Sequence, residues 1–168
     1  MGGGMNRDAV LQLLREDPLA QRLLSAPIPA RLAYIATDGT PRAIPIGYHF
    51  DGTAFVMATS EGAPKIAALR QNPAVALTID TDTHPPLILL VRGTVEVEMV
   101  DGVVPEYLEG ARRTLGDDAL PAFREEVTAL YDRMAKITLV PTWARVYDFE
   151  DRVPDNLVRL MREKGLMS

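Results

Sequence analysis

Short apolar segments separated by tight turn signals are the feature that most limits how this chain can fold. The pairs Asp38-Gly39 and Asp51-Gly52 are typical of turns between antiparallel strands. Together with later apolar runs, they predict strands over Arg31–Thr37, Arg42–Phe50, Thr53–Thr59, Ala74–Asp80, Leu87–Val100 and Ile137–Phe149. Pro45, inside the second strand, indicates an edge or a bulge. Short strands joined by hairpins favour a barrel or sandwich over alternating parallel strands and helices.

Helices are expected around this sheet. The pair Asp17-Pro18 is a helix start signal, because Asp caps the first turn and Pro suits the first helical position. Further helices are expected over Val104–Thr114, Pro121–Lys136 and Val153–Lys164. The first two of these make residues 104–136 a helical insertion between the long strands. An apolar stripe at helical spacing predicts a core-facing side for the second: Phe123, Val127, Leu130, Tyr131 and Met134. The fold class is therefore mainly β with helices (α+β), with antiparallel strands and peripheral helices.

The segment from Ala58 to Leu69 reads as a strand end, a polar turn and the first turns of a helix. Pro64 fits the first helical position, and Lys65 follows it at the helix mouth. The first backbone N–H groups of a helix lack internal partners and carry partial positive charge, so this arrangement suits a phosphate. The alternative is an ordinary strand-to-helix turn with a solvated lysine.

The order of these elements resembles the pyridoxamine 5'-phosphate oxidase-like family, over Arg31–Phe149. The sharpest part is Thr53–Leu77, with its Ala-Thr-Ser strand end, the run from Lys65 to Leu69 and the pair Asn72-Pro73. The resemblance implies a split β-barrel of the FMN-binding type, with FMN at a homodimer interface. Some relatives bind an 8-hydroxy-5-deazaflavin coenzyme (F420) instead, and a few bind haem.

The resemblance also implies a set of cofactor-binding residues. They are Arg42, Pro45, Ile46, Gly47, Ala58, Thr59, Ser60, Lys65, Trp143 and Arg145. Lys65 matches the lysine of the family's phosphate-binding run, whereas Ala63 and Pro64 stand where that run usually has serine and arginine. The family's substrate-phosphate set of Arg, His and Tyr is not found. Pyridoxamine phosphate oxidase activity itself is therefore not expected.

Composition narrows the function classes. The length of 168 residues predicts one domain, over residues 5–168, and the glycines before Met5 make residues 1–4 a cloning remnant. A formal charge of −5 without basic runs argues against nucleic-acid binding. No apolar stretch has membrane-spanning length and no secretion signal is recognisable, so a cytoplasmic location is expected. Without cysteine, and with only His49 and His84, no metal site is expected.

Several functions remain open. The first is an FMN-dependent oxidoreductase that oxidises or reduces a small organic substrate. The others are an F420-dependent reductase and a non-catalytic flavin- or haem-binding protein. No catalytic side chain is assigned, because a flavin itself carries the redox chemistry. The apolar run Leu87–Val91 is too hydrophobic for a strand with one solvated face, which favours a homodimer.

Overall fold

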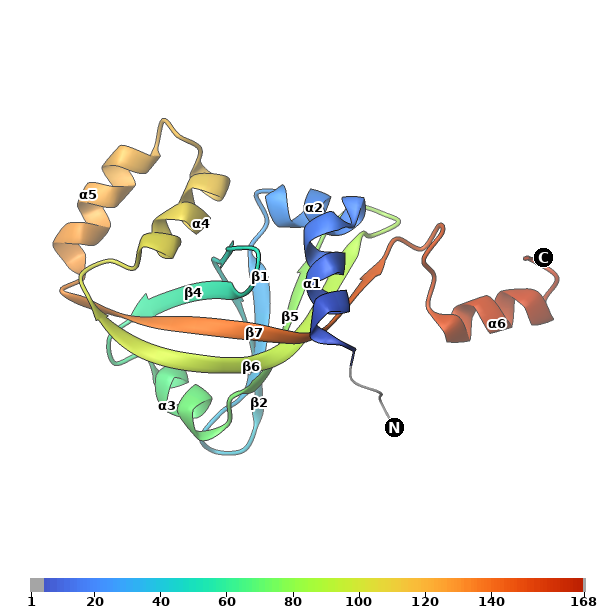
Figure 1. The fold of residues 1–168 in the computed structure, drawn as a ribbon, viewed down its shortest axis with the longest axis horizontal. Coiled ribbons are helices and arrows are strands. Elements are labelled where there is room, and N and C mark those ends of the chain that lie inside the picture. Colours follow the sequence, from blue (N-terminus) through green and yellow to red (C-terminus); the bar gives the residue numbers. More distant parts are fainter. Residues whose placement is uncertain (1–4, 168) are drawn as a thin grey trace.

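A computed structural model describes residues 5–167 as a curved antiparallel sheet with helices around it (Figure 1). The helices are α1 (Arg7–Glu16), α2 (Pro18–Ser25), α3 (Pro64–Gln71), α4 (Pro105–Leu115), α5 (Leu120–Leu130) and α6 (Asp155–Glu163). The strands are β1 (Ala30–Ile35), β2 (Pro41–Ile46), β3 (His49–Phe50), β4 (Phe55–Ser60), β5 (Ala74–Asp80), β6 (Ile88–Asp101) and β7 (Arg133–Tyr147). The α+β class is thus confirmed, while the expected cloning remnant, residues 1–4, lies outside the described part.

The sheet has the order β2-β1-β5-β6-β7-β4-β3, and every neighbouring pair is antiparallel. Its edges, β2 and β3, are consecutive in the chain, and only Gly47 and Tyr48 separate them. The sheet therefore curves back on itself without closing. The strand expected over Arg42–Phe50 is divided at this point, where the Tyr48 ring turns into the core and is 1% exposed. Pro45 lies on an edge strand, as the sequence predicts.

Two long strands, β6 and β7, form the middle of the sheet. They pair from Ile88–Tyr147 to Asp101–Arg133, with one register shift at Arg92 and Gly93. At the shift, a Cβ on Gly93 would lie 2.1 Å from the Val140 carbonyl oxygen, so the close approach of the strands requires glycine there. The bulge changes the face to which the residues after it point.

The helix expected over Pro121–Lys136 is too long. Helix α5 ends at Leu130, Tyr131 is extended, and Arg133 already belongs to β7. Val127 is buried as predicted, but Leu130 is 64% exposed, so the predicted stripe is wrong there. Met134 is buried as a strand residue instead. Pairing of β7 with both β4 and β6 outweighs the helical spacing of these apolar residues.

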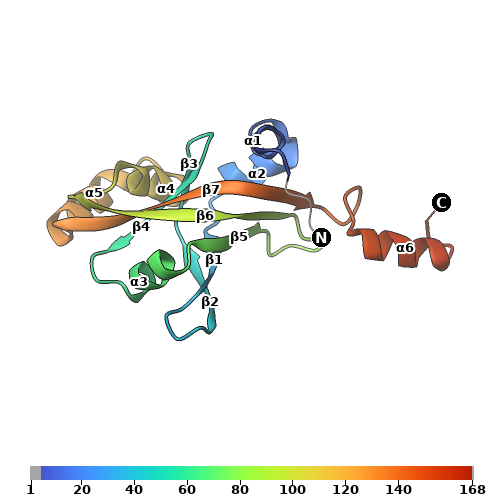
Figure 2. The same cartoon turned by 60° about the horizontal axis from the view of Figure 1, so that its bottom comes forward.

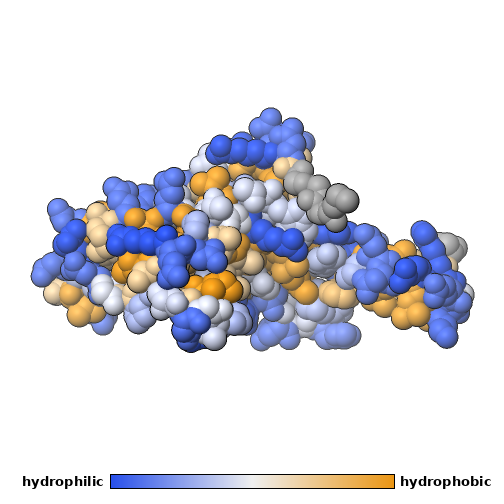
Figure 3. Space-filling view, turned by 90° about the horizontal axis from the view of Figure 1, so that it is seen from below, coloured by the Kyte–Doolittle hydropathy of each residue, from blue (hydrophilic) through white to orange (hydrophobic). Residues whose placement is uncertain are grey.

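The main core lies between the inner face of the sheet and helices α1 and α2 (Figure 2). A smaller cluster, with Val56, Ala58, Val104 and Met134, lies where α4 begins over β4 and β7. Helix α6 projects from the body and buries none of its residues. Figure 3 shows apolar side chains on α6, at its right end, and others among polar ones across the body. Of the helices within residues 5–167, none combines the length and apolar character that crossing a membrane requires.

Candidate functional site

The mouth of α3 is built as the sequence predicts. Strand β4 ends at Ser60, Gly62 turns the chain with φ +79°, and Pro64 begins the helix. The N-cap residue Ala63 gives no side-chain hydrogen bond to the first turn. The Lys65 Nζ donates to Thr59 Oγ1 at 3.0 Å, and within residues 5–167 no carboxylate pairs with it. Pro64 has no N–H, and the N–H groups of Ala63 and Ile66 donate to the carbonyl groups of Ser60 and Ala63. The uncompensated Lys65 ammonium, at the positive end of the helix dipole, is therefore the feature that suits an anion here.

The end of β4 is fixed by its ladder to β7. Ala58, Thr59 and Ser60 pair with Lys136, Ala135 and Met134, respectively. Ala58 is buried, whereas Thr59 and Ser60 are half-buried. These two side chains are thus the accessible part of the predicted Ala-Thr-Ser segment.

Lys136 is not available to a ligand in the way that Lys65 is. Its Nζ lies 2.6 Å from Glu106 Oε1 on α4, and both side chains are about one-quarter exposed. Desolvation would raise the pKa of Glu106, but the hydrogen bond and charge of Lys136 lower it below the ordinary value. This ion pair fixes α4 to the sheet.

A row of residues crosses the outer face of the sheet, and we call it the outer row. Cross-strand pairing places its members on one face: Ala43, Ala33, Ala76, Arg92 and Trp143. The alanines leave a low surface, and the guanidinium of Arg92 stacks 4.3 Å from the Trp143 ring centroid. The row is a flat platform with a cation and an aromatic ring at one end.

Arg42 and Arg92 line the same surface depression, which has a volume of about 290 Å³. Arg42 Nη2 lies 3.1 Å from Asp38 Oδ2, and its Nη1 also bonds to Thr40 Oγ1. The first hairpin therefore holds this predicted phosphate ligand in an exposed ion pair.

Arg145 lies one step further along the outer face than Trp143. It forms an ion pair of 3.3 Å with Asp155 at the start of α6, and its guanidinium is 5.1 Å from the Tyr147 ring centroid. Arg145 thus connects the sheet to the projecting helix.

The predicted residues Pro45 and Ile46 end β2 and Gly47 follows them, at the other end of the strand from Arg42. Pro45 is exposed, and Ile46 packs against the core. Gly47 lines a mainly apolar cavity of about 240 Å³, together with Tyr107 and Phe123 from α4 and α5. The structure therefore brings Thr59 to Lys65, and Arg42 to Arg92 and Trp143, while Gly47 borders a separate cavity.

Sequence reasoning missed the role of Arg92. Its place in a half-solvated strand predicts a surface ion pair, with a flavin contact as the second possibility, but within residues 5–167 it has no ionic partner and stacks on Trp143 instead. Arg92 lies directly opposite Trp143 on β6 and β7 because of the bulge, and no local sequence signal indicates this pairing. Within the same residues, no group of three His, Cys, Asp or Glu side chains could hold a metal ion.

Comparisons with known proteins agree with this fold. Residues 17–136 match the family model described as pyridoxamine 5'-phosphate oxidase. A solved structure described as an F420 reductase is 27% identical, and the match covers 74% of this chain and 94% of that chain with a TM-score of 0.59. No curated protein matches the sequence.

Two more distant structures share the fold. A Listeria innocua protein named for pyridoxamine 5'-phosphate oxidase is 21% identical, covering 79% of this chain and 98% of that chain with a TM-score of 0.57. HutZ, the heme storage protein of Vibrio cholerae, is 15% identical. The match covers 79% of this chain and 94% of that chain, with a TM-score of 0.57. One fold therefore occurs in proteins described as having different functions, and the function of this chain has to be argued from its site.

Proposed function

Because this chain belongs to the pyridoxamine 5'-phosphate oxidase family, we propose that it is an oxidoreductase with a flavin-type cofactor, bound between two copies of the chain. When bound, the cofactor supplies hydride or electron transfer, and the protein supplies binding, orientation and control of solvent access. The substrate is a small organic molecule.

The observation that carries this proposal is the uncompensated ammonium of Lys65. A lysine without a carboxylate partner among residues 5–167, at the positive end of the α3 dipole, suits a phosphate group. Thr59 holds the ammonium in place through its hydroxyl. These residues fit the phosphate of a flavin-type cofactor.

Of the two cofactors that the resemblance allows, the helix mouth favours F420 over FMN. Ala63 and Pro64 supply no side-chain ligand where FMN-binding relatives usually place serine and arginine, and Pro64 also lacks an N–H donor. F420 differs in the position of its phosphate and carries an acidic tail. The similarity to a structure described as an F420 reductase supports the same choice. FMN remains the second candidate, because Lys65 and Arg42 match the family's phosphate-binding positions.

The outer row suits the cofactor ring. A planar ring lies well on the alanine surface, where Arg92 and Trp143 provide a cation and an aromatic edge. Arg42 and Arg92 line one depression and attract the negative charges of the cofactor. No acid or base is assigned to catalysis, and Lys65, Arg42 and Arg92 act by binding and orientation.

The cavity beside Gly47 suits the substrate. It lies at the end of β2, whose backbone we expect along the ring, and Tyr107 and Phe123 give it aromatic walls with their centroids 5.8 Å apart. At about 240 Å³ it fits a compact, largely apolar molecule, such as a quinone, a nitro-compound or an unsaturated ring.

A second copy of the chain is part of this proposal. The outer row is open in a single chain, and Ile88 and Leu90 beside it are only half-buried. Ile88, Leu90 and the row together form a surface that a two-fold partner covers while it encloses the cofactor.

Titration of the purified, cofactor-free protein with F420, FMN and haem tests the proposal. We expect saturable binding of F420, weaker binding of FMN, and turnover of a quinone or nitro-compound by the reduced F420 complex. Tighter binding of FMN would favour the second candidate. Binding without turnover on such a panel would favour a storage or carrier protein, and absence of binding to all three would overturn the assignment.

A further inference from the structure

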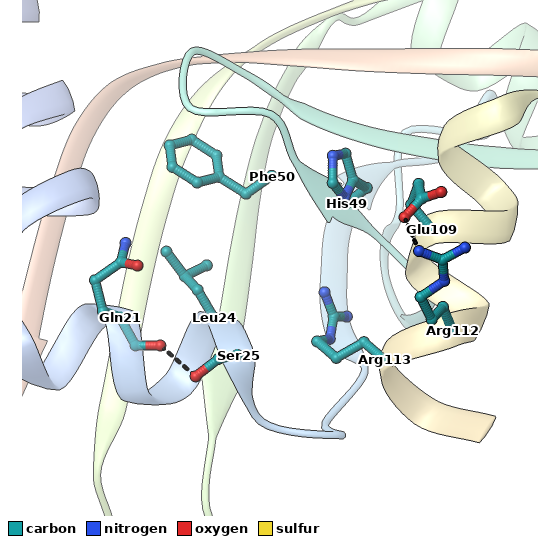
Figure 4. A pocket seen from close by; sticks show the side chains of 8 residues that line it. All are labelled: Gln21, Leu24, Ser25, His49, Phe50, Glu109, Arg112 and Arg113. Atoms are coloured by element: carbon teal, nitrogen blue, oxygen red, sulfur yellow. Dashed lines mark hydrogen bonds and ion pairs between the residues drawn. The ribbon is translucent and has the colours of Figure 1, made fainter. Parts of the chain in front are cut away.

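A second cavity lies against α4, on the side away from Gly47. It has a volume of about 300 Å³ and is formed between α2, β3 and α4 (Figure 4). Leu24 from α2 and Phe50 from β3 line one side, and Arg113 extends from α4 into the space between the two helices. None of the residues proposed to hold the cofactor or to bind substrate lines it.

Arg113 has donors that no group in the described part of the chain uses. Its guanidinium stacks 3.9 Å from the ring centroid of Tyr48. Its Nε and Nη2 are buried, and within residues 5–167 neither atom has a hydrogen-bond acceptor. These two atoms form one edge of the guanidinium, the edge that binds two oxygens of a carboxylate or phosphate at once. Burial lowers the pKa of Arg113, and within residues 5–167 no carboxylate forms an ion pair with it.

The neighbouring carboxylate does not compensate for this charge. Glu109 lines the cavity, but its Oε2 lies 3.6 Å from Arg112 Nη1. Arg112 is itself exposed and also lies 3.4 Å from Asp117. The local charges are therefore paired, except for Arg113, and a buried donor without an acceptor is destabilising.

We propose that this cavity binds a small oxyanion, a carboxylate or phosphate, carried on a compact apolar group. The oxyanion accepts hydrogen bonds from Nε and Nη2 of Arg113. The apolar group lies against Leu24 and Phe50, and Ser25 and His49 supply polar contacts at the rim. Binding converts an uncompensated buried cation into a charge-assisted, bidentate pair.

This cavity and the one beside Gly47 share no lining residue. Gly110 of α4 packs directly on Tyr48, where an added Cβ would lie 2.7 Å from the Tyr48 carbonyl oxygen. Arg113 covers the Tyr48 ring on the far side of the same contact. The oxyanion site is thus separate from the proposed substrate cavity, and it does not depend on the proposed function.

Calorimetric titration of the full chain with phenyl phosphate, benzoate and inorganic phosphate tests the proposal. In the Lys65→Glu variant, which removes the phosphate receptor proposed at the mouth of α3, we expect one site per chain, with phenyl phosphate or benzoate binding more tightly than inorganic phosphate. Preference between the first two shows whether the natural ligand carries phosphate or carboxylate. Arg113→Gln is expected to weaken binding about tenfold or more, because a bidentate charged pair is lost. Arg113→Lys keeps the positive charge but lacks the two-donor edge of the guanidinium. We expect its affinity to lie between those of Arg113→Gln and the parent chain.

Matched variants separate this site from its surroundings. Arg112→Gln, at the neighbouring and ion-paired position, is expected to change affinity less than about twofold. Lys65→Glu is expected to leave benzoate binding at Arg113 unchanged, while any phosphate binding at the mouth of α3 is lost. If Arg113→Gln unfolds, Ser25→Glu, which places a carboxylate at the rim, is expected to block binding. Equal affinity in a folded Arg113→Gln variant, or no heat from any probe with the parent chain, would overturn the proposal.

Discussion

Asp17 and Arg152 are 135 positions apart in the sequence, yet Arg152 Nη1 donates to Asp17 Oδ2 over 2.5 Å. The other oxygen of the same carboxylate accepts from the N–H groups of Leu19 and Ala20, at 3.0 and 3.1 Å. A single side chain therefore caps α2 and ties the segment before α6 to the amino-terminal helices.

This carboxylate makes stability depend on pH in the acid range. Desolvation would raise the pKa of Asp17, but hydrogen bonds from Ala20 and Arg152 and the charge of Arg152 lower it. Its stabilising effect is thus fully present above the unfolded pKa, near 4, and is lost as the pH falls through the lower folded pKa. Asp17→Asn, which keeps a capping oxygen, is expected to cost about 1 kcal/mol at pH 7. Urea unfolding at several pH values should show this difference shrinking below pH of about 4; a constant difference would contradict the assignment.

Lys65→Glu is expected to weaken cofactor binding about a hundredfold or more, because a charge-assisted contact becomes a repulsion. Folding should be nearly unchanged, since the Lys65 ammonium makes one hydrogen bond, to Thr59. Arg70→Glu, in the exposed last turn of the same helix, is the matched control and should bind almost normally. Fluorescence titration with F420 and FMN measures both, and equal affinities of the two variants would remove Lys65 from the site.

Trp143 is the one tryptophan of the chain, so its emission reports on the outer row. We expect a bound flavin-type cofactor to quench it in proportion to occupancy. Arg92→Gln removes the guanidinium that stacks 4.3 Å from the ring, and it should alter the emission of the free protein and weaken binding about tenfold. Glu96→Gln, on the same strand and face, serves as the control. Full binding without any change in Trp143 emission would place the ring elsewhere.

Leu90→Arg is expected to convert the protein to a monomer and to reduce cofactor affinity with it. The substitution puts a charge in the half-buried surface beside the outer row, where desolvation in an interface is costly. Leu130→Arg, on the exposed side of α5, is the control and should leave assembly unchanged. Light scattering at micromolar concentration gives the mass of each variant. A monomeric parent protein that still binds the cofactor would contradict a cofactor site formed between two copies of the chain.

Gly110→Ala is expected to destabilise the fold by about 2 kcal/mol, because the new methyl group would meet the Tyr48 backbone. Gly116→Ala, at the end of the same helix, has open space around it but a φ of +82°, so it measures backbone strain alone. Thermal unfolding of the two variants compares the stability lost through the steric contact at Gly110 with the stability lost through backbone strain at Gly116. A smaller loss for Gly110→Ala would mean that α4 shifts at little cost.

Local signals predict much of this fold from the sequence. Strand β5 spans the expected Ala74–Asp80, and Asp17 caps α2 as its Asp-Pro pair indicates. Each of these features depends on residues that are close together in the chain. Where pairing between distant strands decides, local patterns fail: the apolar spacing around Met134 continues a helix, but β4 and β6 hold that residue in β7.

The candidate site also has one part that local sequence predicts and another that depends on contacts between distant segments. Lys65 stands at a helix mouth because a strand end, a turn and Pro64 follow one another directly. The stacking of Arg92 on Trp143 depends on a bulge in a ladder of two long strands, and no local pattern reveals which residues it brings together. The contact of Arg113 with Tyr48 depends on how α4 settles on the break between β2 and β3, which is set by packing alone.

The pairing of β4 with β7 also affects how fast the chain folds. It joins Phe55 to Leu139, so α3, β5, β6 and the two helices after them lie within the loop that it closes. The entropy of closing such a loop is lost before its contacts form, which makes pairing of this kind slow. Until β7 docks, Trp143 has no place beside Arg92 and the platform does not exist. The mouth of α3 can therefore form before the outer row, and the proposed platform for a cofactor ring is completed only when the final strand docks.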